Sequence, residues 1–366
     1  MTLRIVSTTT QLIDLKSAWH SLTKEPLRSF DWNLSWWLNF GDDFELRTYC
    51  FEQEGQVVGI APFFIDRWVG QQRLRFLGSG TTCSDYAEII ATPEARCDFI
   101  NAIAADLQSS NSIGMLELEG IRGNQVDELI CESIGKSFQE KPFWQYACEL
   151  EPTWVLEMPD SWEQFLSSSS KSLRRKVRKA EKRMDAGELV VRSTLDGLDF
   201  ESAFDVLVDL HQQRFESKGE PGVFSDPRFT SFLKDAIDLL RQSQRAEILV
   251  GYAGDDPIVA QLYLISDSGP QLYQSGIRID KMNMEPGHTL FTYAVRKAMS
   301  QGYPVFDFLR GSEPYKPYWG AVPQQLLKVR CVSKQPVPTA VNQTYRFLRS
   351  LKHGCANLLS QSSTSH

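Results

Sequence analysis

Hydrophobic and polar positions along this chain form a series of strand-like and helix-like segments that occurs twice. The first series comprises strands 46–53, 56–65 and 73–77, helix 94–108, strand 113–118, helix 127–136 and strand 145–150. The second series comprises strand 188–193, a helical region 199–244 broken at 218–227, strands 246–252, 258–266 and 271–279, helix 287–300, and strands 303–309 and 324–332. The pattern therefore predicts an α/β chain with mixed sheets in which one fold is duplicated.

The two series define three predicted regions. Residues 1–152 form the first domain, residues 153–332 form the second, and the composition changes after residue 332. In the region 333–366, SKQPVPTA is typical of a linker, 339–359 has the pattern of an amphipathic helix with a basic face, and the last residues are predicted to be disordered. We expect this helix to dock onto the protein's own body, with peripheral membrane contact as the alternative.

An aromatic cluster, FDWNLSWWLNF at 30–40, stands near the beginning of the chain. Trp32, Trp36, Trp37 and Phe40 have roughly helical spacing. This spacing favours packing in a hydrophobic core over stacking on a ligand.

A strongly basic amphipathic helix is predicted within 161–188, between the two halves. Its apolar face includes Phe165, Leu173 and Val177, and Gly187 is suited to end it. The opposite face has Glu181 as its one acid among seven cations, which are Arg174, Arg175, Lys176, Arg178, Lys179, Lys182 and Arg183. The face is either simply solvated or a surface that binds phosphates, nucleotide sugars or RNA.

Composition restricts the classes of function. The chain has 366 residues, 42% of them hydrophobic and 23% charged, with a net charge of -7 and a pI of about 5.4. This balance argues against non-specific nucleic-acid binding by the surface as a whole. The seven cysteines are scattered and never in CxxC spacing, which indicates a reducing compartment and no metal site. With no signal-peptide pattern and no apolar run long enough to span a bilayer, we predict a cytoplasmic protein.

The segment 303–320, YPVFDFLRGSEPYKPYWG, joins an apolar strand to a cluster of polar and aromatic residues. Asp307 shares a strand face with residues that would otherwise be core. Its carboxylate either pairs with Arg310 or accepts backbone N–H groups, or it is an orienting group or base at a cleft. After the strand, Pro314 and Pro317 disfavour a continuous helix. This loop is a candidate substrate wall and offers Glu313, Tyr315, Lys316, Tyr318 and Trp319.

A second group of candidate residues comprises the strand LYQSGIRID, the turn KMNMEPG and the helix that follows Pro286. Proline suits a first helical turn. The backbone N–H groups of Gly287, His288 and Thr289 are then predicted to lack intrahelical acceptors. Such a helix start binds anions, because free donors and the helix dipole both favour negative charge.

These motifs resemble the GNAT acetyltransferase superfamily, in its branch named for the cellulose-biosynthesis protein CelD and the BioF2-like acetyltransferases. In the second half the resemblance rests on SKSLRRKVRKAEKR, HQQRFESKG, EPGHTLF and FDFLRGSEPYKPYWGA, and in the first half on AWHSL, SWWLNF and GIAPFF. It covers about residues 10–332 and implies tandem GNAT-like lobes, each with a mixed, mostly antiparallel sheet flanked by helices. The FemABX peptidyltransferases, which use aminoacyl-tRNA, share this arrangement. The superfamily signature Q/R-x-x-G-x-G/A falls on Met284, Gly287 and Thr289, so that only its first glycine is present.

The resemblance implies direct attack of an amine or hydroxyl on the thioester of acetyl-CoA or another acyl-CoA, without a metal. The C-terminal lobe would bind this donor through two sets of residues, with pantetheine against the backbone of Gln274, Ser275, Gly276 and Ile277, and pyrophosphate at Gly287, His288 and Thr289. The acceptor would lie between the lobes, where its expected contacts are Arg174, Arg175, Arg214, Arg310, Glu313 and Trp319.

Four residues are candidates for proton handling. His211 is suited to act as general base because imidazole titrates near neutral pH, although a lone histidine is more often structural. Asp307 would orient the base or the acceptor ammonium. Tyr315 or Lys316 would protonate the leaving thiolate or stabilise the oxyanion, with a plain surface cation as the alternative for Lys316.

We therefore expect an acyl-CoA-dependent N- or O-acyltransferase that acts on a small polar acceptor, with a sugar or nucleotide sugar as an attractive case. One alternative is aminoacyl transfer from tRNA, supported by the basic helix. The other is a non-catalytic double-GNAT binding module in polysaccharide or envelope biosynthesis.

Overall fold

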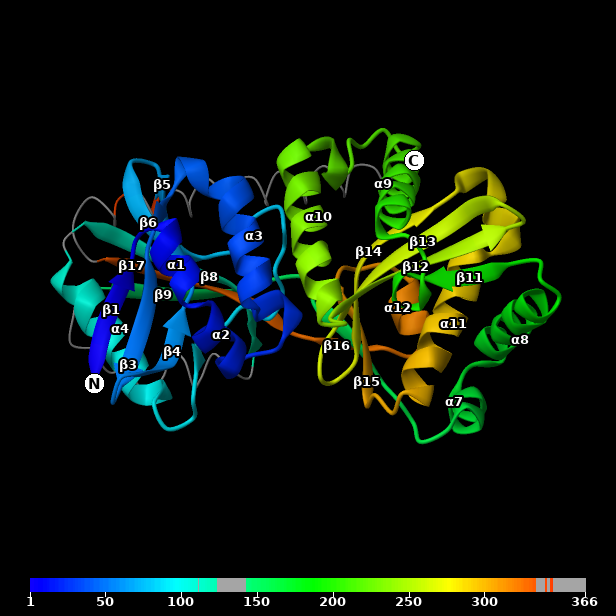
Figure 1. Cartoon of the computed structure of the whole chain (residues 1–366), viewed down its shortest axis with the longest axis horizontal. Coiled ribbons are helices and arrows are strands. Elements are labelled where there is room, and N and C mark those ends of the chain that lie inside the picture. Colours follow the sequence, from blue (N-terminus) through cyan, green and yellow to red (C-terminus); the bar gives the residue numbers. More distant parts are fainter. Residues whose placement is uncertain (111, 124–142, 334–339, 341–342, 345–366) are drawn as a thin grey trace, which may run out of the picture.

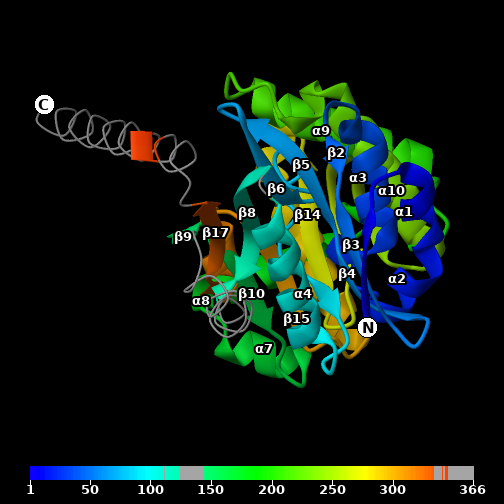
Figure 2. The ribbon, with the colours of Figure 1, turned by 90° about the vertical axis from the view of Figure 1, so that its left-hand side faces the viewer.

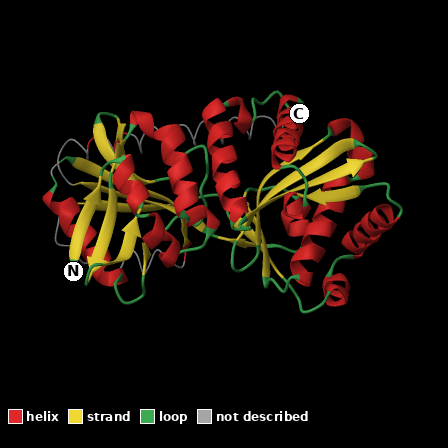
Figure 3. Cartoon of the chain, viewed as in Figure 1, coloured by secondary structure: helices red, strands yellow, loops and turns green. Residues whose placement is uncertain are grey.

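The chain folds into two lobes that lie side by side (Figure 1). The computed structural model describes residues 1–110, 112–123, 143–333, 340 and 343–344. In both lobes strands form the centre and helices cover their faces (Figure 3). The prediction of mixed, mostly antiparallel sheets is confirmed. The predicted helix at 127–136 and, apart from three single positions, the predicted C-terminal helix at 339–359 lie outside the described residues.

The N-terminal lobe contains two sheets. The four-stranded sheet has the order β1 (Thr2–Val6), β3 (Thr48–Gln53), β4 (Gln56–Ala61) and β7 (Ile90–Ala91). The six-stranded sheet has the order β2 (Glu45–Leu46), β5 (Phe63–Trp68), β6 (Gln71–Phe76), β8 (Ile113–Arg122), β17 (Leu326–Ser333) and β9 (Phe143–Glu149). The predicted strand 56–65 is divided between the sheets at Pro62, which has no N–H to donate to a ladder.

Helices cover both faces of the four-stranded sheet (Figure 2). One face is covered by α1 (Thr9–Asp14), α2 (Lys16–Leu22) and α3 (Phe30–Phe40), and the other by α4 (Arg96–Ser109). Alternation along β3 explains this arrangement, because Tyr49 and Phe51 pack in the core cluster of α4, whereas Cys50 packs in the cluster of the first three helices.

The C-terminal lobe is built on one seven-stranded sheet. Its order is β11 (Val190–Ser193), β12 (Ala246–Ala253), β13 (Asp256–Ile265), β14 (Pro270–Ile277), β15 (Val305–Arg310), β10 (Thr153–Glu157) and β16 (Val322–Gln324). The helices of this lobe are α7 (Trp162–Ser168), α8 (Lys171–Asp185), α9 (Phe200–Glu216), α10 (Pro227–Gln242), α11 (Pro286–Ser300) and the short α12 (Tyr315–Tyr318). The predicted break in the helical region 199–244 is confirmed between α9 and α10.

Two strands, β10 and β17, mark where the chain passes from one lobe to the other. β10, which follows the N-terminal lobe in sequence, lies between β15 and β16, and β17, which follows the C-terminal lobe, lies between β8 and β9. Because β17 pairs along its length on both sides, its backbone groups are satisfied within the N-terminal sheet. The division at residue 332 is therefore wrong for 326–332, since the apolar pattern predicts a strand but not the sheet that it joins.

A hydrophobic core continues across the contact between the lobes. The ring of Trp32 on α3 meets Phe232 of α10 edge-on at 4.9 Å between centroids, and Tyr273 of β14 at 5.1 Å. Trp32 and Trp36 are 0% and 3% exposed, which confirms core packing for this part of the aromatic cluster. The lobes are thus held by a shared core.

Candidate active site

The central feature of the C-terminal lobe is a V-shaped opening in its sheet. The parallel strands β14 and β15 pair at one position, Gln271 with Asp307, and then diverge. The corresponding strands of the N-terminal lobe, β6 and β8, stay paired over Gln72–Arg75. The difference fits the expectation that the C-terminal lobe binds the donor, since only a splayed pair leaves strand edges free for a ligand.

Irregular backbone in both strands produces this opening. On β14, Leu262 pairs with Gln274 and Tyr263 with Leu272, so that Tyr273 is an extra, bulged residue. On β15, Leu309 has a φ of 52°, a conformation that costs a non-glycine residue about 1–3 kcal/mol. The Leu309 N–H donates to Oδ1 of Asp307 at 2.8 Å, which stabilises this turn of the strand.

Asp307 is therefore used to shape the end of β15. It is 5% exposed, and its Oδ2 accepts a hydrogen bond from the Tyr86 hydroxyl of the N-terminal lobe at 2.7 Å. Burial raises the pKa of this carboxyl to about 6, although the hydrogen bonds from Tyr86 and the Leu309 N–H oppose the change. Of the two structural interpretations, acceptance of a backbone N–H is confirmed and pairing with Arg310 is wrong. Asp307 lines neither of the cavities described below.

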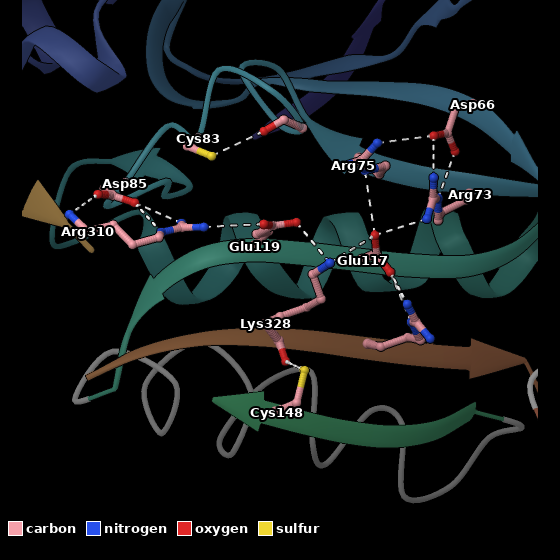
Figure 4. Close-up of polar contacts among 12 residues, drawn as sticks. Asp66, Arg73, Arg75, Cys83, Asp85, Glu117, Glu119, Cys148, Arg310 and Lys328 are labelled. Atoms are coloured by element: carbon pink, nitrogen blue, oxygen red, sulfur yellow. Dashed lines mark hydrogen bonds and ion pairs between the residues drawn. The ribbon is translucent and has the colours of Figure 1, made fainter. Parts of the chain in front are cut away.

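Arg310 pairs instead with Asp85 of the N-terminal lobe, as Figure 4 shows. The Arg310 Nε donates to Asp85 Oδ1 at 2.8 Å, and its backbone N–H donates to Oδ2 at 2.9 Å. Glu119 lies 3.5 Å from Nη1 on the other side. The guanidinium is thus held by two carboxylates while still lining a cavity, which makes it a rigid part of that wall.

Lys316 also supports the end of β15. It is 1% exposed, and its Nζ donates to the carbonyls of Leu309 at 3.2 Å and Arg310 at 2.8 Å and pairs with Glu313 at 2.9 Å. These three acceptors match the three protons of the ammonium. The interpretation as a surface cation is wrong, because the helix turn at Pro314 places this lysine underneath the strand.

A cavity of about 580 Å³, here called the basic cavity, lies on the α11 side of the opening. Its cations are Lys176 of α8 and Arg214 and Lys218 at the end of α9, while Glu285 is its one acid. Its remaining wall includes Ser275, Ile277, Gly287, His288 and Tyr315. A surplus of cations beside a helix start favours a ligand that carries phosphate groups.

The start of α11 supplies two of the three predicted N–H donors. Pro286 has no N–H, and Gly287 and His288 line the basic cavity. Thr289 does not fit the prediction, because its N–H donates to the Glu285 carbonyl at 3.2 Å and its side chain is fully buried. Thr289 is the fourth residue of this helix, and the carbonyl of the N-cap residue Glu285 accepts the first intrahelical bond, as in any α-helix.

Of the four residues predicted to contact pantetheine, Ser275 and Ile277 line the basic cavity. Gln274 faces the opposite side of the sheet, as alternation along a strand requires. Gly276 packs against α9 so closely that a Cβ there would lie 2.5 Å from the backbone nitrogen of His211. The contact explains why a glycine is needed at this position.

A second cavity, here called the inter-lobe cavity, has a volume of about 630 Å³. The N-terminal lobe contributes Thr82, Cys83 and Asp85, and the C-terminal lobe contributes residues of both arms of the V, including Gln274 and Arg310. Both volumes fall in the range of roughly 300–1,000 Å³ that is usual for ligand sites.

The two cavities share a wall. Three segments of the chain line both cavities with residues that are close in sequence. The inter-lobe cavity is lined by Gln274, Phe215 and Glu313, and the basic cavity by their respective neighbours Ser275, Arg214 and Tyr315. The wall contains the opening between β14 and β15. The two cavities therefore adjoin each other beside the V.

His211 lies in the wall of the inter-lobe cavity. It is 2% exposed, stacks on Phe215 at 4.4 Å between centroids, and has Gln212 Oε1 3.3 Å from its Nδ1. Its Nε2 has no partner among the residues that the structure describes. Burial lowers the pKa of this imidazole to about 4, so the ring is neutral at pH 7 and can accept a proton.

Several predicted acceptor contacts have other positions. Trp319 is 1% exposed and packs against Phe165 and Phe291, so it is part of the core. Arg174 donates to the carbonyls that end α7, the shortest contact being 2.7 Å to Ser169. Arg175 lies in a separate groove on α8, and Arg214 belongs to the basic cavity. Arg310 and Glu313 do line the inter-lobe cavity.

Sequence reasoning missed residues whose role depends on the fold. Asp85 and Tyr86 lie in the loop GSGTTCSDY, which has no helix start, and they reach the site only because the lobes pack together. Gln261 is 1% exposed and lines the basic cavity, where its Oε1 accepts a hydrogen bond from Tyr263 at 2.6 Å. A buried amide in the middle of the apolar strand 258–266 was the signal for this residue.

Comparison with known proteins adds a family. A family model described as an acetyltransferase (GNAT) domain matches residues 167–317. These residues of the C-terminal lobe are therefore a GNAT-type domain, and the rest of the chain lies outside the match. The match covers α8 to α12 and hence both strands of the V, and it makes the protein a transferase of the GNAT type, as predicted.

Solved structures resemble the whole two-lobed fold. FemX is 12% identical with a TM-score of 0.63, and the alignment covers 93% of this chain and 100% of that one. The structure of L-PGS from Bacillus licheniformis is 12% identical with a TM-score of 0.53, at 91% and 96% coverage. The C-terminal domain of a putative lysylphosphatidylglycerol synthetase from Agrobacterium fabrum is 8% identical with a TM-score of 0.54, at 92% and 95% coverage. At these identities the likeness concerns the fold alone, and it extends over both lobes. A search of curated proteins found no match.

Within the described part of the chain, no helix is long and apolar enough to cross a membrane. The same residues contain no group of three or more His, Cys, Asp or Glu side chains that could hold a metal ion.

Proposed function

We propose that the protein transfers an acyl group from a coenzyme A thioester in the basic cavity to an acceptor in the inter-lobe cavity. The wall shared by the two cavities carries this proposal, because it contains the opening between β14 and β15 and so lets donor and acceptor meet. The GNAT domain supports the reaction class, since its matched residues include both strands of the opening.

The basic cavity fits a donor with a pyrophosphate. The free N–H groups of Gly287 and His288 and the charges of Lys176, Arg214 and Lys218 would hold phosphate oxygens. The imidazole Nδ1 of His288 is buried without a partner among the described residues, and burial lowers the pKa of that ring to about 4. We assign the amide nitrogen of Gln261 to a carbonyl of the donor, because its Oε1 is already occupied by Tyr263.

The residues of the shared wall suggest how protons move. The acceptor attacks the thioester carbonyl, and the neutral His211 takes the proton that the acceptor loses. Burial raises the pKa of Tyr315, so its hydroxyl stays protonated at neutral pH and can donate a hydrogen bond to the leaving thiolate. Asp307 and Lys316 position the end of β15 and with it Arg310. This assignment moves both from the predicted catalytic set to a positioning role.

Calorimetric titration with acetyl-CoA, longer acyl-CoAs and free CoA tests the donor site. A Gly287→Glu variant should weaken binding by roughly 100-fold or more, because like charges placed together cost several kcal/mol. A Gly287→Gln variant has the same size without the charge and should lose much less. Failure of every thioester to bind the wild-type chain would refute the proposal.

Aminoacyl-tRNA is the second candidate donor, favoured by one surface feature. An exposed row of cations runs along α8 and comprises Lys171, Arg175, Arg178 and Lys182. The same helix contributes Lys176 to the wall of the basic cavity. Replacing Lys171, Arg175 and Arg178 with alanine should reduce the salt dependence of tRNA binding by about three ion equivalents. Arg174 is left intact because it holds the end of α7. Tight salt-dependent tRNA binding without thioester binding would favour this donor.

A further inference from the structure

The inter-lobe cavity has a charge opposite to that of the basic cavity. Its acids are Asp85, Glu151, Glu220 and Glu313, and Arg310 is its one cation at pH 7, since burial keeps His211 neutral. Asp85 is paired with Arg310 and Glu313 with Lys316. Two acids, Glu151 and Glu220, are left without a cation.

These two acids are exposed and stand on different elements of the rim. Glu151 precedes Pro152, whose carbonyl accepts the Gly311 N–H at 3.3 Å, so it adjoins the end of β15. Glu220 belongs to the loop between α9 and α10, where its backbone N–H donates to Phe215 at 3.0 Å. No Lys, Arg or His among the described residues lies within ion-pair distance of either carboxylate.

The buried wall contains a second, independent feature that points to a ligand. His211 is 2% exposed, lines the cavity, and has no described partner at Nε2. A neutral imidazole nitrogen accepts a hydrogen bond or a proton and suits an amine at this position. The rim acids suit a different group, since a carboxylate without a partner attracts a cation.

Resting on the function proposed above, we infer that the acceptor carries two amino groups, one acylated beside His211 and one held as an ammonium by Glu151 and Glu220. The acceptor class is thus a diamine or a compound with an equivalent second cation. A nucleotide sugar fits this cavity poorly, because its phosphates would face four carboxylates.

The transfer step balances with groups that the proposal names. The neutral amine nitrogen attacks the thioester carbonyl carbon, a C–N amide bond forms, and the C–S bond breaks. His211 takes the proton from nitrogen. The thiolate of the donor leaves, accepts a hydrogen bond from the Tyr315 hydroxyl and takes a proton from solvent, while His211 returns its proton to solvent. The second ammonium keeps its charge throughout, so its attraction to the rim acids affects acceptor binding before the chemical step.

A matched set of acceptors tests the inference on the full chain. The probes are 1,4-diaminobutane, 1-aminobutane and 4-aminobutan-1-ol, with acetyl-CoA as donor and release of free thiol as the readout. We expect kcat/KM for the diamine to exceed that of either monoamine, with the difference in KM. In the double variant Glu151→Gln, Glu220→Gln, the ratio of kcat/KM for the diamine to kcat/KM for the monoamines should fall by roughly five- to tenfold, as expected for two partly exposed charge contacts.

Glu216→Gln is the control, because it removes the same charge from an exposed site on α9 outside the cavity. It should leave the preference unchanged. Equal kcat/KM values for the diamine and the monoamines would overturn the inference, and so would a preference that survives the double variant. Turnover of neutral hydroxyl acceptors alone would overturn it while leaving acyl transfer intact.

Calorimetry with 1,4-diaminobutane in the absence of donor separates this inference from the donor proposal. Saturable binding that the double variant loses and Glu216→Gln keeps would support the diamine site even if no thioester bound. Absence of such binding would refute the site whatever the donor proves to be.

Discussion

Replacing Asp307 with asparagine should stabilise the protein, and the gain should depend on pH. Burial raises the pKa of this carboxyl from 3.8 to about 6. A raised carboxyl pKa means that the folded state holds its proton more tightly than the unfolded state. Stability is therefore lost as the pH rises from about 4 to about 6, and the full ionisation penalty is present above that range.

The penalty follows from the size of the shift. A change of about two pKa units corresponds to roughly 3 kcal/mol at pH 7, as an order of magnitude. Asparagine keeps an oxygen that can accept the Leu309 N–H, and the Tyr86 hydroxyl can accept from its amide in place of donating. The difference between variant and wild type should grow by about 2 kcal/mol between pH 4.5 and pH 7 in favour of asparagine.

Urea denaturation followed by tryptophan fluorescence, at intervals from pH 4.5 to pH 7.5, measures this difference. Contributions from all other ionisable groups cancel between the two proteins. Asp205→Asn, which removes the same charge from the exposed side of α9, is the control. A difference that stays constant, or that shifts in favour of the wild type at higher pH, would refute our account of Asp307.

The same variant separates two roles of the residue. As a positioning residue, Asp307 can be replaced by asparagine with turnover reduced only a few-fold. As a general base, its loss should lower kcat by about 100-fold or more. A large loss of kcat in a variant with raised stability would show that Asp307 acts in catalysis and does more than position β15.

Three further substitutions test the packing and charge around the opening by urea denaturation. Gly276→Ala should lower the free energy of unfolding by about 1–3 kcal/mol, because the added Cβ meets the backbone of α9; an unchanged value would mean that strand and helix are less closely packed. Lys316→Met should cost about 3–5 kcal/mol by leaving two strand carbonyls and Glu313 without their donor, and a loss below about 1 kcal/mol would contradict the contacts found. Glu117→Gln should destabilise the protein at pH 7. Burial alone would raise the pKa of Glu117, but the cations Arg73, Lys328 and Arg330 outweigh it and lower that pKa. Figure 4 shows Arg73 and Lys328 beside this carboxylate. The destabilisation should therefore shrink as the pH falls below about 4.5, and a destabilisation that grows there would contradict this account.

Local pattern predicted the parts of the site that lie on single elements. The strand with Asp307, the helix start at Pro286 and the basic α8 can each be recognised from spacing, because strand alternation, proline geometry and helical periodicity depend on neighbouring residues. Thr289 was misassigned because it is the fourth residue of the helix that begins at Pro286, and the carbonyl of the N-cap residue Glu285 accepts its N–H.

Contacts between distant segments could not be predicted in the same way. Tyr86 and Asp307 are 221 positions apart, and Asp85 and Arg310 are 225 apart, so nothing in the local pattern relates them. The position of β17 depends on competition between two sheets for one strand. Single-sequence patterns give the type of an element and its buried face, whereas pairing is decided by the assembled fold.

The position of the lobes and the geometry of the opening depend on the same contacts. The β15 arm of the V is held by β10, whose preceding residue Pro152 bonds to Gly311, and by Asp85 and Tyr86 of the N-terminal lobe. The β14 arm is held by α9 through the close contact at Gly276, and by the N-terminal lobe through Tyr273, whose hydroxyl donates to the Thr82 carbonyl at 2.7 Å. A rotation of the lobes would therefore disturb both arms and change the inter-lobe cavity at the same time. Under the proposed function, the packing of the lobes therefore sets both the shape of the acceptor cavity and the width of the opening between donor and acceptor.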